Sequence, residues 1–361
     1  MNRLRVGFSI ADQSLRRSKS IGILNVSLGL LGELVKQPEI GEVVVFGNSS
    51  LAPIPNATLQ THDSVATRRW ARLWWDQFGV YRAAKSSGCD WLFLPKGFAS
   101  FVGKPPVKMA AYVHDAMHDF YRSHYGGGFS PFENFYFPRA FEAVLRHATV
   151  IFTNSEFTAQ EARRMANKLG TEPPRIVVAG IGFDPVKLRE PKQDLITMLV
   201  SKWPHKMTGR AVEWLARWQS KTQYGGQVQL VGDLPPGVAL PPLSNWRLIS
   251  RLGGEDFETI LQRSRAVVYF SEYEGFGMPP IEAALRQAAP VYSRIPAMME
   301  TAGGLGFPFD NDSSESFDAA LNGALACQAA RIKQWAEILS KRHAWPAVAR
   351  RVAVALAQPP R

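Results

Sequence analysis

The sequence has little cysteine, no long apolar run, and fewer acidic than basic residues. Its 361 residues include two cysteines, Cys89 and Cys327, which excludes a disulfide framework and a clustered Cys/His zinc site. No stretch approaches the roughly 18 consecutive apolar residues of a membrane span. The apolar run before Asp12 is shorter than the core of a secretory signal. We therefore expect a cytoplasmic protein that is attached at most to a membrane surface.

The charge balance favours an anionic partner. The sequence has 42 lysines and arginines against 31 acidic residues, a net charge of +11. Three partners would match this surplus: nucleic acid, phospholipid headgroups, or a phosphate-bearing substrate. There is no zinc-finger spacing, no RNP-like segment and no lysine tract, so nucleic acid is not the expected partner.

Short β-branched and aromatic runs alternate with amphipathic stretches along most of the chain. Before residue 190, the pattern predicts strands at 4–10, 43–46, 91–94, 107–113, 149–153 and 175–179, with helices near 21–36, 66–86, 132–148 and 156–169. The pattern then restarts, with strands near 195–200, 228–232, 246–250, 266–270 and 290–293. A final helix is predicted at 340–356.

Strands separated by helices require parallel sheets with right-handed crossovers. The predicted fold class is therefore α/β, with two Rossmann-like doubly wound domains that face a central cleft. We place the first domain at 1–180, a linker at 181–194 and the second domain at 195–340. The remaining segment, 341–361, is expected to form a helix that packs back on the first domain.

The segment SEYEGFGMPPIEA, residues 271–283, sets Glu274 and Glu282 on either side of a short glycine loop. A buried strand precedes the loop, and a helix that begins at Pro279 follows it. The amides available to an anion there belong to Gly275, Phe276, Gly277 and Met278. Carboxylates beside a phosphate are tolerated when they accept hydrogen bonds from sugar hydroxyls, so the segment suits a nucleotide sugar. In the alternative interpretation, Glu282 only stabilises the first helical turn and Glu274 is solvated.

The longer stretch EGFGMPPIEAALRQAAPV closely resembles the E-x7-E motif of retaining GT-B glycosyltransferases, particularly the large family 4. Four further stretches are similar to segments of that family, in the same order: RLWWDQFGVYRAAKSSGCDWLFLP (72–95), AAYVHDAMHDFY (110–121), IFTNSEFTAQEARRM (151–165) and HAWPAVARRV (343–352). The resemblance therefore covers nearly the whole chain.

The resemblance implies roles for individual residues. Glu282 would bind ribose, while Glu274 and the amides of Phe276, Gly277 and Met278 would hold the transferred sugar and the diphosphate. His114 matches a family histidine that lies beside the reacting sugar. Without the resemblance, a histidine bonded only to Asp115 or to the backbone would be the simpler interpretation.

The resemblance also implies cations for the leaving group. In VSKWPHKMTG, Lys206 matches the family lysine and Lys202 takes the place of its arginine, although the spacing is one residue shorter. Solvated loop lysines are the alternative. Gly22, in SKSIGILNVS, resembles a family glycine in a loop whose backbone approaches the donor phosphate, but Asn25 stands where an arginine is usual.

Together these features predict retaining transfer of a hexose or deoxyhexose from a nucleoside-diphosphate sugar, with no metal or other cofactor. Resemblance to members that use GDP-mannose favours GDP over UDP. The expected acceptor is a saccharide, free or lipid-linked, in cell-surface polysaccharide or lipopolysaccharide synthesis. We interpret Asp310-Asn311-Asp312 as a turn and a helix cap. The alternatives are a nucleotide-sugar epimerase of the same fold and a noncatalytic protein that binds nucleotide sugars or nucleic acid.

The stretch RRWARLWWDQF, residues 68–78, combines tryptophan with basic residues, a composition that suits a lipid headgroup layer. We expect Trp74 to pack inward and Arg68, Arg69 and Arg72 to remain available for phospholipid. This interpretation predicts a peripheral position on an anionic membrane surface, at the inner face of the cell membrane.

Overall fold

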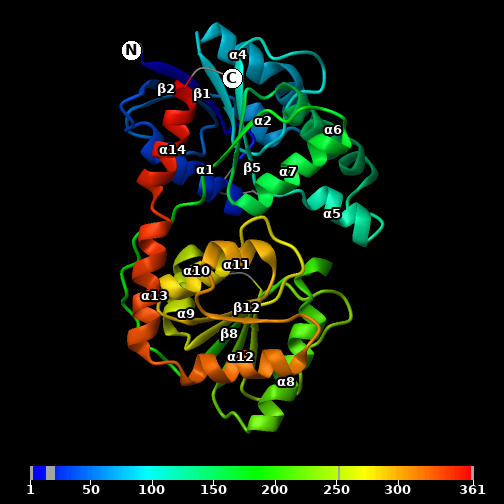
Figure 1. The fold of residues 1–361 in the computed structure, drawn as a ribbon, viewed down its shortest axis with the longest axis vertical. Coiled ribbons are helices and arrows are strands. Elements are labelled where there is room, and N and C mark those ends of the chain that lie inside the picture. Colours follow the sequence, from blue (N-terminus) through cyan, green and yellow to red (C-terminus); the bar gives the residue numbers. More distant parts are fainter. Residues whose placement is uncertain (1–2, 14–20, 251–252, 359–361) are drawn as a thin grey trace. The chain divides into compact units, whose positions relative to one another are not determined.

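A computed structural model describes residues 3–13, 21–250 and 253–358 of the chain (Figure 1). The chain divides into two units, of which the first comprises residues 1–184 and 343–361 and the second residues 185–342. The first division falls inside the predicted linker, and the second falls two residues after the start of the predicted final segment. Among the described residues, no helix has both the length and the apolar character needed to cross a membrane.

The first unit is built on a seven-stranded parallel sheet with the order β3-β2-β1-β4-β5-β6-β7. Its strands are β1 (Leu4–Ser9), β2 (Ile40–Gly47), β3 (Ala57–Thr61), β4 (Trp91–Leu94), β5 (Lys108–Val113), β6 (Val150–Thr153) and β7 (Arg175–Val178). Its helices are α1 (Ile21–Leu34), α2 (Asp63–Thr67), α3 (Arg69–Trp74), a π-helix (Trp75–Gly79), α4 (Val80–Ser86), α5 (Met117–His124), α6 (Pro131–His147), α7 (Glu156–Lys168) and α14 (Trp345–Ala357). The pairing is in register at the centre of the sheet, where Val6 lies between Val43 and Trp91.

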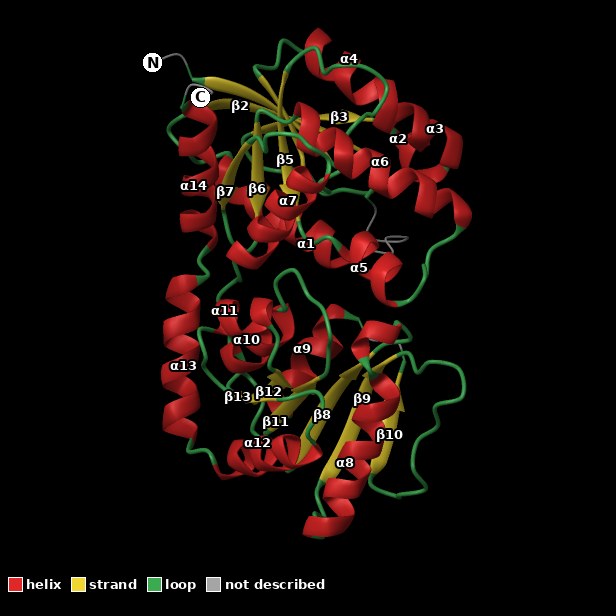
Figure 2. Ribbon diagram, turned by 45° about the vertical axis from the view of Figure 1, so that its right-hand side comes forward, coloured by secondary structure: helices red, strands yellow, loops and turns green. Residues whose placement is uncertain are grey.

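The second unit repeats this architecture with six parallel strands in the order β10-β9-β8-β11-β12-β13 (Figure 2). Its strands are β8 (Leu195–Val200), β9 (Gln227–Gly232), β10 (Trp246–Ile249), β11 (Ala266–Tyr269), β12 (Ala289–Ser293) and β13 (Phe307–Phe309). Its helices are a 3-10 turn (Pro204–Lys206), α8 (Thr208–Thr222), α9 (Gly254–Arg263), α10 (Met278–Leu285), α11 (Pro296–Ala302), α12 (Ser314–Ala326) and α13 (Ala329–Arg342). The prediction of two doubly wound parallel-sheet domains is confirmed.

Every predicted strand is present, but β3 and β13 were not predicted. β3 is a partly exposed edge strand, so its sequence lacks the apolar run of a buried strand. β13 has only three residues and contains Pro308, and proline is tolerated in a sheet mainly at an edge.

Two predicted helices are interrupted. The helix predicted at 66–86 consists of α2, α3, the π-helix and α4, with Arg68 in an extended conformation between the first two. The prediction of one continuous helix at 340–356 is also wrong, because α13 ends at Arg342 and a separate helix, α14, begins at Trp345. Pro346 has no N–H for a hydrogen bond to the previous turn, and it is accommodated at the start of the new helix.

Helix α14 returns to the first unit and packs on α1 and β6 (Figure 2). The Trp345 ring lies so close to Gly29 and Gly182 that a Cβ atom at either glycine would come within 2.3 Å of it. Arg351 Nε donates a hydrogen bond of 2.8 Å to the Ala179 carbonyl. Glycine is therefore required at both positions to seat this helix.

Candidate active site

Two residues that the sequence placed 68 positions apart meet at the carboxyl edge of the second sheet. Lys206 follows β8 and Glu274 follows β11, and these two neighbouring strands form the switch point of the sheet. Connections leave β8 and β11 toward opposite sides, which opens a crevice for ligands in doubly wound sheets. Lys206 Nζ forms an ion pair with Glu274 Oε1.

Tyr269, the last residue of β11, completes this cluster. Its hydroxyl donates a hydrogen bond of 2.6 Å to Glu274 Oε1 and accepts one from Lys206 Nζ. The side chains of Lys206 and Glu274 are 16% and 15% exposed, so the pair lies mostly out of water. Tyr269 was not predicted from the sequence, where the only indication of its role is that a residue with a polar group ends a predicted strand.

The electrostatics of the cluster keep Glu274 ionised. Burial alone would raise the pKa of Glu274, but attraction to Lys206 and hydrogen bonds from Lys206 and Tyr269 outweigh it and lower the pKa. His205 is buried next to the pair, and its desolvation, followed by the Lys206 charge, lowers its pKa to about 4. At neutral pH the cluster therefore holds one carboxylate, one ammonium and a neutral imidazole.

The loop that carries Lys206 is fixed by its own hydrogen bonds. Thr208 Oγ1 donates to the Ser201 carbonyl at 2.7 Å and accepts from the Ser201 amide at 3.1 Å. These two bonds join the end of β8 to the start of α8. Lys202 also lies in this loop, where it is exposed, and it makes no hydrogen bond or ion pair with the described residues. The structure thus brings Lys206, and not Lys202, to Glu274.

Buried side chains hold the glycine loop in place through hydrogen bonds. The Ser271 amide donates to Ser293 Oγ at 2.9 Å, and Thr301 Oγ1 donates to the Phe276 carbonyl at 2.8 Å. The Phe276 side chain is itself buried in the unit. The loop backbone is thereby held at the edge of the sheet, between β11 and α10.

Gly277 ends the loop in a conformation that requires glycine. Its φ is +77°, and a Cβ atom there would lie 2.3 Å from Met298 Cγ. It is the N-cap of α10, so the amides of Gly277 and Met278 have no partner within the helix. Gly275 and Phe276 precede them in the same loop. The helix N-terminus therefore presents backbone donors and positive potential to an anion.

Glu282 lies on α10, half-buried, and its carboxylate receives no hydrogen bond or ion pair from the described part of the chain. The neighbouring Arg286 instead donates to the Glu282 carbonyl and pairs with Glu258. Burial raises the pKa of Glu282 against the opposing Arg286 charge. The same carboxylate adds to the rise in the pKa of Tyr269, which places Glu282 near the cluster.

His114 follows β5 in the first unit. Its Nε2 lies 2.7 Å from the Pro95 carbonyl, and its own carbonyl accepts a bond of 2.8 Å from Asn154 Nδ2. Burial lowers the pKa of His114 to about 4 despite the Pro95 hydrogen bond, so the imidazole is neutral at pH 7. Because a carbonyl oxygen only accepts, Nε2 carries the proton and Nδ1 is left as an acceptor.

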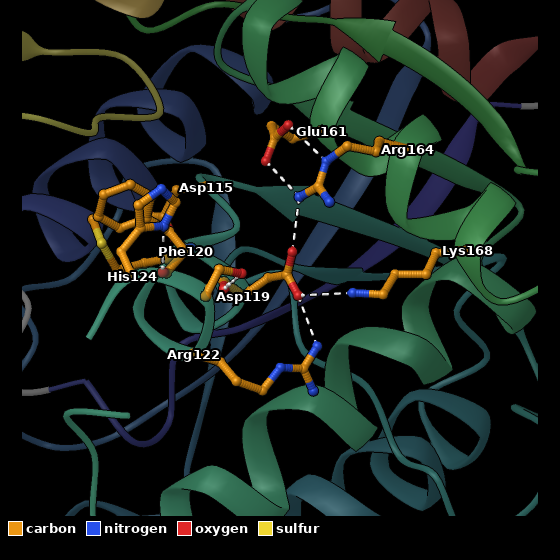
Figure 3. A network of polar contacts seen from close by, with 10 residues as sticks. Asp115, Asp119, Phe120, Arg122, His124, Glu161, Arg164 and Lys168 are labelled. Carbon is orange, nitrogen blue, oxygen red and sulfur yellow. Dashed lines mark hydrogen bonds and ion pairs between the residues drawn. The ribbon is translucent and has the colours of Figure 1, made fainter. Parts of the chain in front are cut away.

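The segment after His114 is held in place by the Asp119 network drawn in Figure 3. The buried Asp119 carboxylate receives Arg122 at 2.7 Å from α5, and Arg164 at 2.8 Å and Lys168 at 3.6 Å from α7. Burial alone would raise the pKa of Asp119, and the hydrogen bonds from the two arginines and the nearby positive charges lower it. These contacts fix α5 against α7 and so fix the end of the His114 segment.

Gly22 lies in a helix and not in the loop that the resemblance implied, whereas the turn predicted at Asp310-Asn311-Asp312 is present at Asn311 and Asp312, although Ser313 caps the helix that follows. Gly22 lies in the first turn of α1, where a Cβ would meet nothing within 4 Å, and residues 14–20 are outside the described part of the chain. Asp310 pairs with Arg294 at 2.9 Å, and Asn311 Nδ2 donates to the Ser271 carbonyl at 2.9 Å. Within the described ranges, no group of three or more His, Cys, Asp or Glu residues is arranged to hold a metal ion.

The expectation for the tryptophans was wrong. Trp74 is 51% exposed, and it is the next residue, Trp75, that packs inward with 4% exposure. The π-helix that begins at Trp75 changes which side chains of this segment point inward, and the periodicity of an α-helix does not predict that change. Arg72 is also engaged, in an ion pair of 3.0 Å with Asp12.

The chain is similar over its whole length to solved glycosyltransferase structures. A sucrose-phosphate synthase from Thermosynechococcus elongatus is 14% identical with a TM-score of 0.67, covering 98% of both chains. Anabaena HepE, solved with UDP and glucose, is 15% identical with a TM-score of 0.68, covering 98% of this chain and 100% of that one. WaaG, a glycosyltransferase involved in lipopolysaccharide biosynthesis, is 14% identical with a TM-score of 0.67 and the same coverage.

This likeness shows that the chain has the GT-B fold. No protein-family model matches the sequence, and no curated protein matches it either.

Proposed function

We propose that the protein is a retaining glycosyltransferase of family 4 that transfers a hexose or deoxyhexose from a nucleoside-diphosphate sugar to a saccharide. The observation that carries this proposal is the Lys206–Glu274–Tyr269 cluster at the switch point of the second sheet, beside the N-terminus of α10. HepE, which shares the fold, was solved with UDP and glucose. A cluster of this composition offers both a cation for a diphosphate and a carboxylate for sugar hydroxyls.

The donor would be held by groups that still have capacity for hydrogen bonds. The Lys206 ammonium has three N–H donors, of which Glu274 and Tyr269 take two, so one remains for a phosphate oxygen. The amides of Gly277 and Met278 would bind the same diphosphate. Glu274 would accept hydrogen bonds from the sugar, and the unpartnered Glu282 carboxylate would accept them from the ribose.

The reaction would use stabilisation of charge and no metal. As the sugar leaves, negative charge grows on the diphosphate, where Lys206 and the helix N-terminus lie ready to stabilise it. In retaining transfer of this kind, the leaving phosphate oxygen takes the proton of the acceptor hydroxyl on the same face of the sugar. His114, neutral and with Nδ1 as an acceptor, would receive a hydrogen bond from a donor-sugar hydroxyl.

We propose guanine as the nucleobase, on the resemblance of the HD-containing segment around His114 to enzymes that use GDP-mannose. The UDP bound to HepE makes uracil the competing base. Thermal unfolding with GDP, UDP, ADP and their sugars tests both. At about 100 times its dissociation constant, a ligand adds about 2.7 kcal/mol to the free energy of unfolding, which raises the melting temperature of a domain of this size by roughly 5–11 °C.

Two variants sharpen this experiment. Glu282→Gln and Lys206→Ala should reduce the shift caused by the preferred nucleotide, while Lys333→Ala, on α13, should not change it. If none of the nucleotides stabilises the wild-type protein, the proposed function is wrong. Product analysis separates transfer from epimerisation, because only transfer forms a glycosidic bond to an added saccharide.

We further propose that the acceptor is lipid-linked and that the first unit touches an anionic membrane surface at the inner face of the cell membrane. Trp70, on α3, is 81% exposed, and the adjacent Arg68 and Arg69 are exposed as well. Interfacial tryptophan with basic residues suits a headgroup layer. WaaG, of the same fold, is involved in lipopolysaccharide biosynthesis.

Vesicle sedimentation tests the membrane surface. Binding should occur to anionic vesicles at low salt, weaken at high salt, and decrease in Trp70→Ala. Trp203→Ala, which removes an exposed tryptophan of the second unit, is the matched control. Equal binding to anionic and neutral vesicles at low salt would contradict the proposal.

A further inference from the structure

A pocket with polar groups lies in the first unit, at the carboxyl ends of β1 and β4. These neighbouring strands are the switch point of the first sheet, since β2 and β3 lie on one side and β5 to β7 on the other. Ser9 ends β1, Leu94 ends β4, and both line the pocket. Its volume is about 130 Å³, roughly ten times the space that one water needs. The pocket therefore has the place and size for a ligand.

The charges in this pocket are arranged around two carboxylates. Asp12, whose side chain is 8% exposed, forms ion pairs with both Lys96 and Arg72. Burial alone would raise the pKa of Asp12, but the two cations outweigh it and keep the carboxyl ionised. Lys96 and Arg72 thus share Asp12 as their ion-pair partner.

Asp76 is the carboxyl that lacks a cation. It accepts a hydrogen bond of 3.1 Å from the Tyr136 hydroxyl, which in turn accepts one of 3.2 Å from Gln77 Nε2. Among the described residues, no lysine or arginine forms an ion pair with it. Burial, followed by the Asp12 charge, raises the pKa of Asp76 to about 7. The carboxyl lies on the π-helix, a rare conformation that is frequent at functional sites.

The rest of the lining is apolar. Phe98 and Phe137 stack with ring centroids 5.2 Å apart, and both line the pocket with Val80. A surface that combines an apolar wall with a few placed polar groups is typical of sites for small organic ligands. Sugar rings match it, because they have apolar C–H faces and hydroxyls that donate to carboxylates.

We propose that this pocket binds an uncharged saccharide ring of the acceptor and that Asp76, positioned by Tyr136, binds one of its hydroxyls. This inference rests on the proposed transferase function and specifies its second substrate. A sugar phosphate is disfavoured where Asp76 is ionised, because Asp12 and Asp76 then balance the charges of Lys96 and Arg72 and Asp76 would repel the phosphate. An amino sugar is disfavoured, because its ammonium would lie beside Lys96 and Arg72.

Saturation-transfer NMR on the full chain tests the proposal, with and without saturating GDP or UDP. The probes are methyl α-mannoside, methyl α-glucoside, glucose 6-phosphate and glucosamine. We expect a methyl glycoside to bind most tightly, and Asp76→Asn to weaken its binding about tenfold. Tyr136→Phe should weaken it less, because it leaves the carboxyl in place. Asp310→Asn, in the second unit, should leave binding unchanged.

The possible results separate this inference from the proposed function. Tighter binding of glucose 6-phosphate or glucosamine, or unchanged binding in Asp76→Asn, overturns the pocket assignment. So does the absence of saccharide binding in a protein that GDP or UDP stabilises, and in that case the transferase function stands. Asp76-dependent binding of a glycoside in a protein that no nucleotide stabilises would instead support the pocket and reject the transferase function.

Discussion

The Asp76 pocket predicts an unusual dependence of stability on pH. In the folded protein, Asp76 keeps its proton up to about pH 7, whereas the ordinary value for an aspartic acid is 3.8. Between these values the folded state binds more protons than the unfolded chain at this site. The free energy of unfolding therefore falls as the pH rises through this window. The Asp76→Asn variant has an uncharged side chain of the same shape, so its free energy of unfolding should not fall at this site as the pH rises.

The magnitude follows from the environment of the carboxyl. Each pKa unit corresponds to about 1.4 kcal/mol, so a change from 3.8 to about 7 corresponds to at most about 4 kcal/mol above pH 7. Lys96 and Arg72 reduce the cost of ionising Asp76, and Asp12 increases it. We expect Asp76→Asn to match the wild type near pH 4 and to be more stable by about 1–4 kcal/mol at pH 8.

Thermal unfolding at a series of pH values measures this difference. For a unit of this size, 1 kcal/mol corresponds to roughly 2–4 °C in melting temperature. Other groups titrate in the same range, among them His114 and His205, whose pKa values are lowered to about 4. Because both proteins contain them, they cancel in the comparison of variant with wild type. A difference that stays constant from pH 4 to pH 8 would refute the reasoning.

Three further substitutions test the active site and its supports. Lys206→Ala should slow the proposed transfer about a hundredfold or more, because it removes the proposed donor to the developing phosphate charge, and near-normal turnover would reject its role. Gly277→Ala should cost about 1–3 kcal/mol of stability, because φ is +77° and the new Cβ would meet Met298. Gly225→Ala, in open space, serves as its control in thermal unfolding. Asp119→Ala should cost about 1–3 kcal/mol at pH 7, and the cost should vanish as the pH falls through the lowered pKa of Asp119.

The alternation of short apolar strands with amphipathic helices was enough to predict both doubly wound domains. This succeeds because buried parallel strands must be apolar along their whole length, as in Leu195–Val200, so the sequence marks them directly. The turn at Gly277 was also predictable, since a glycine two residues before a pair of prolines indicates a turn into a helix, although the helix begins at Met278, one residue before the predicted start. The edge strand Phe307–Phe309 was missed because it is short and contains a proline.

The partners of the polar groups were decided only by the tertiary structure. Tyr269 meets Lys206 and Glu274 because β8 and β11 are neighbours in the sheet, although β11 ends at Tyr269, 69 residues after β8 ends at Val200. Asp12 and Asp76 come together in the same way at the ends of β1 and β4, and a π-helix sets the facing of Asp76. Local sequence determines which segments are strands and helices, whereas strand order determines which charges meet, and strand order depends on the packing of the whole unit.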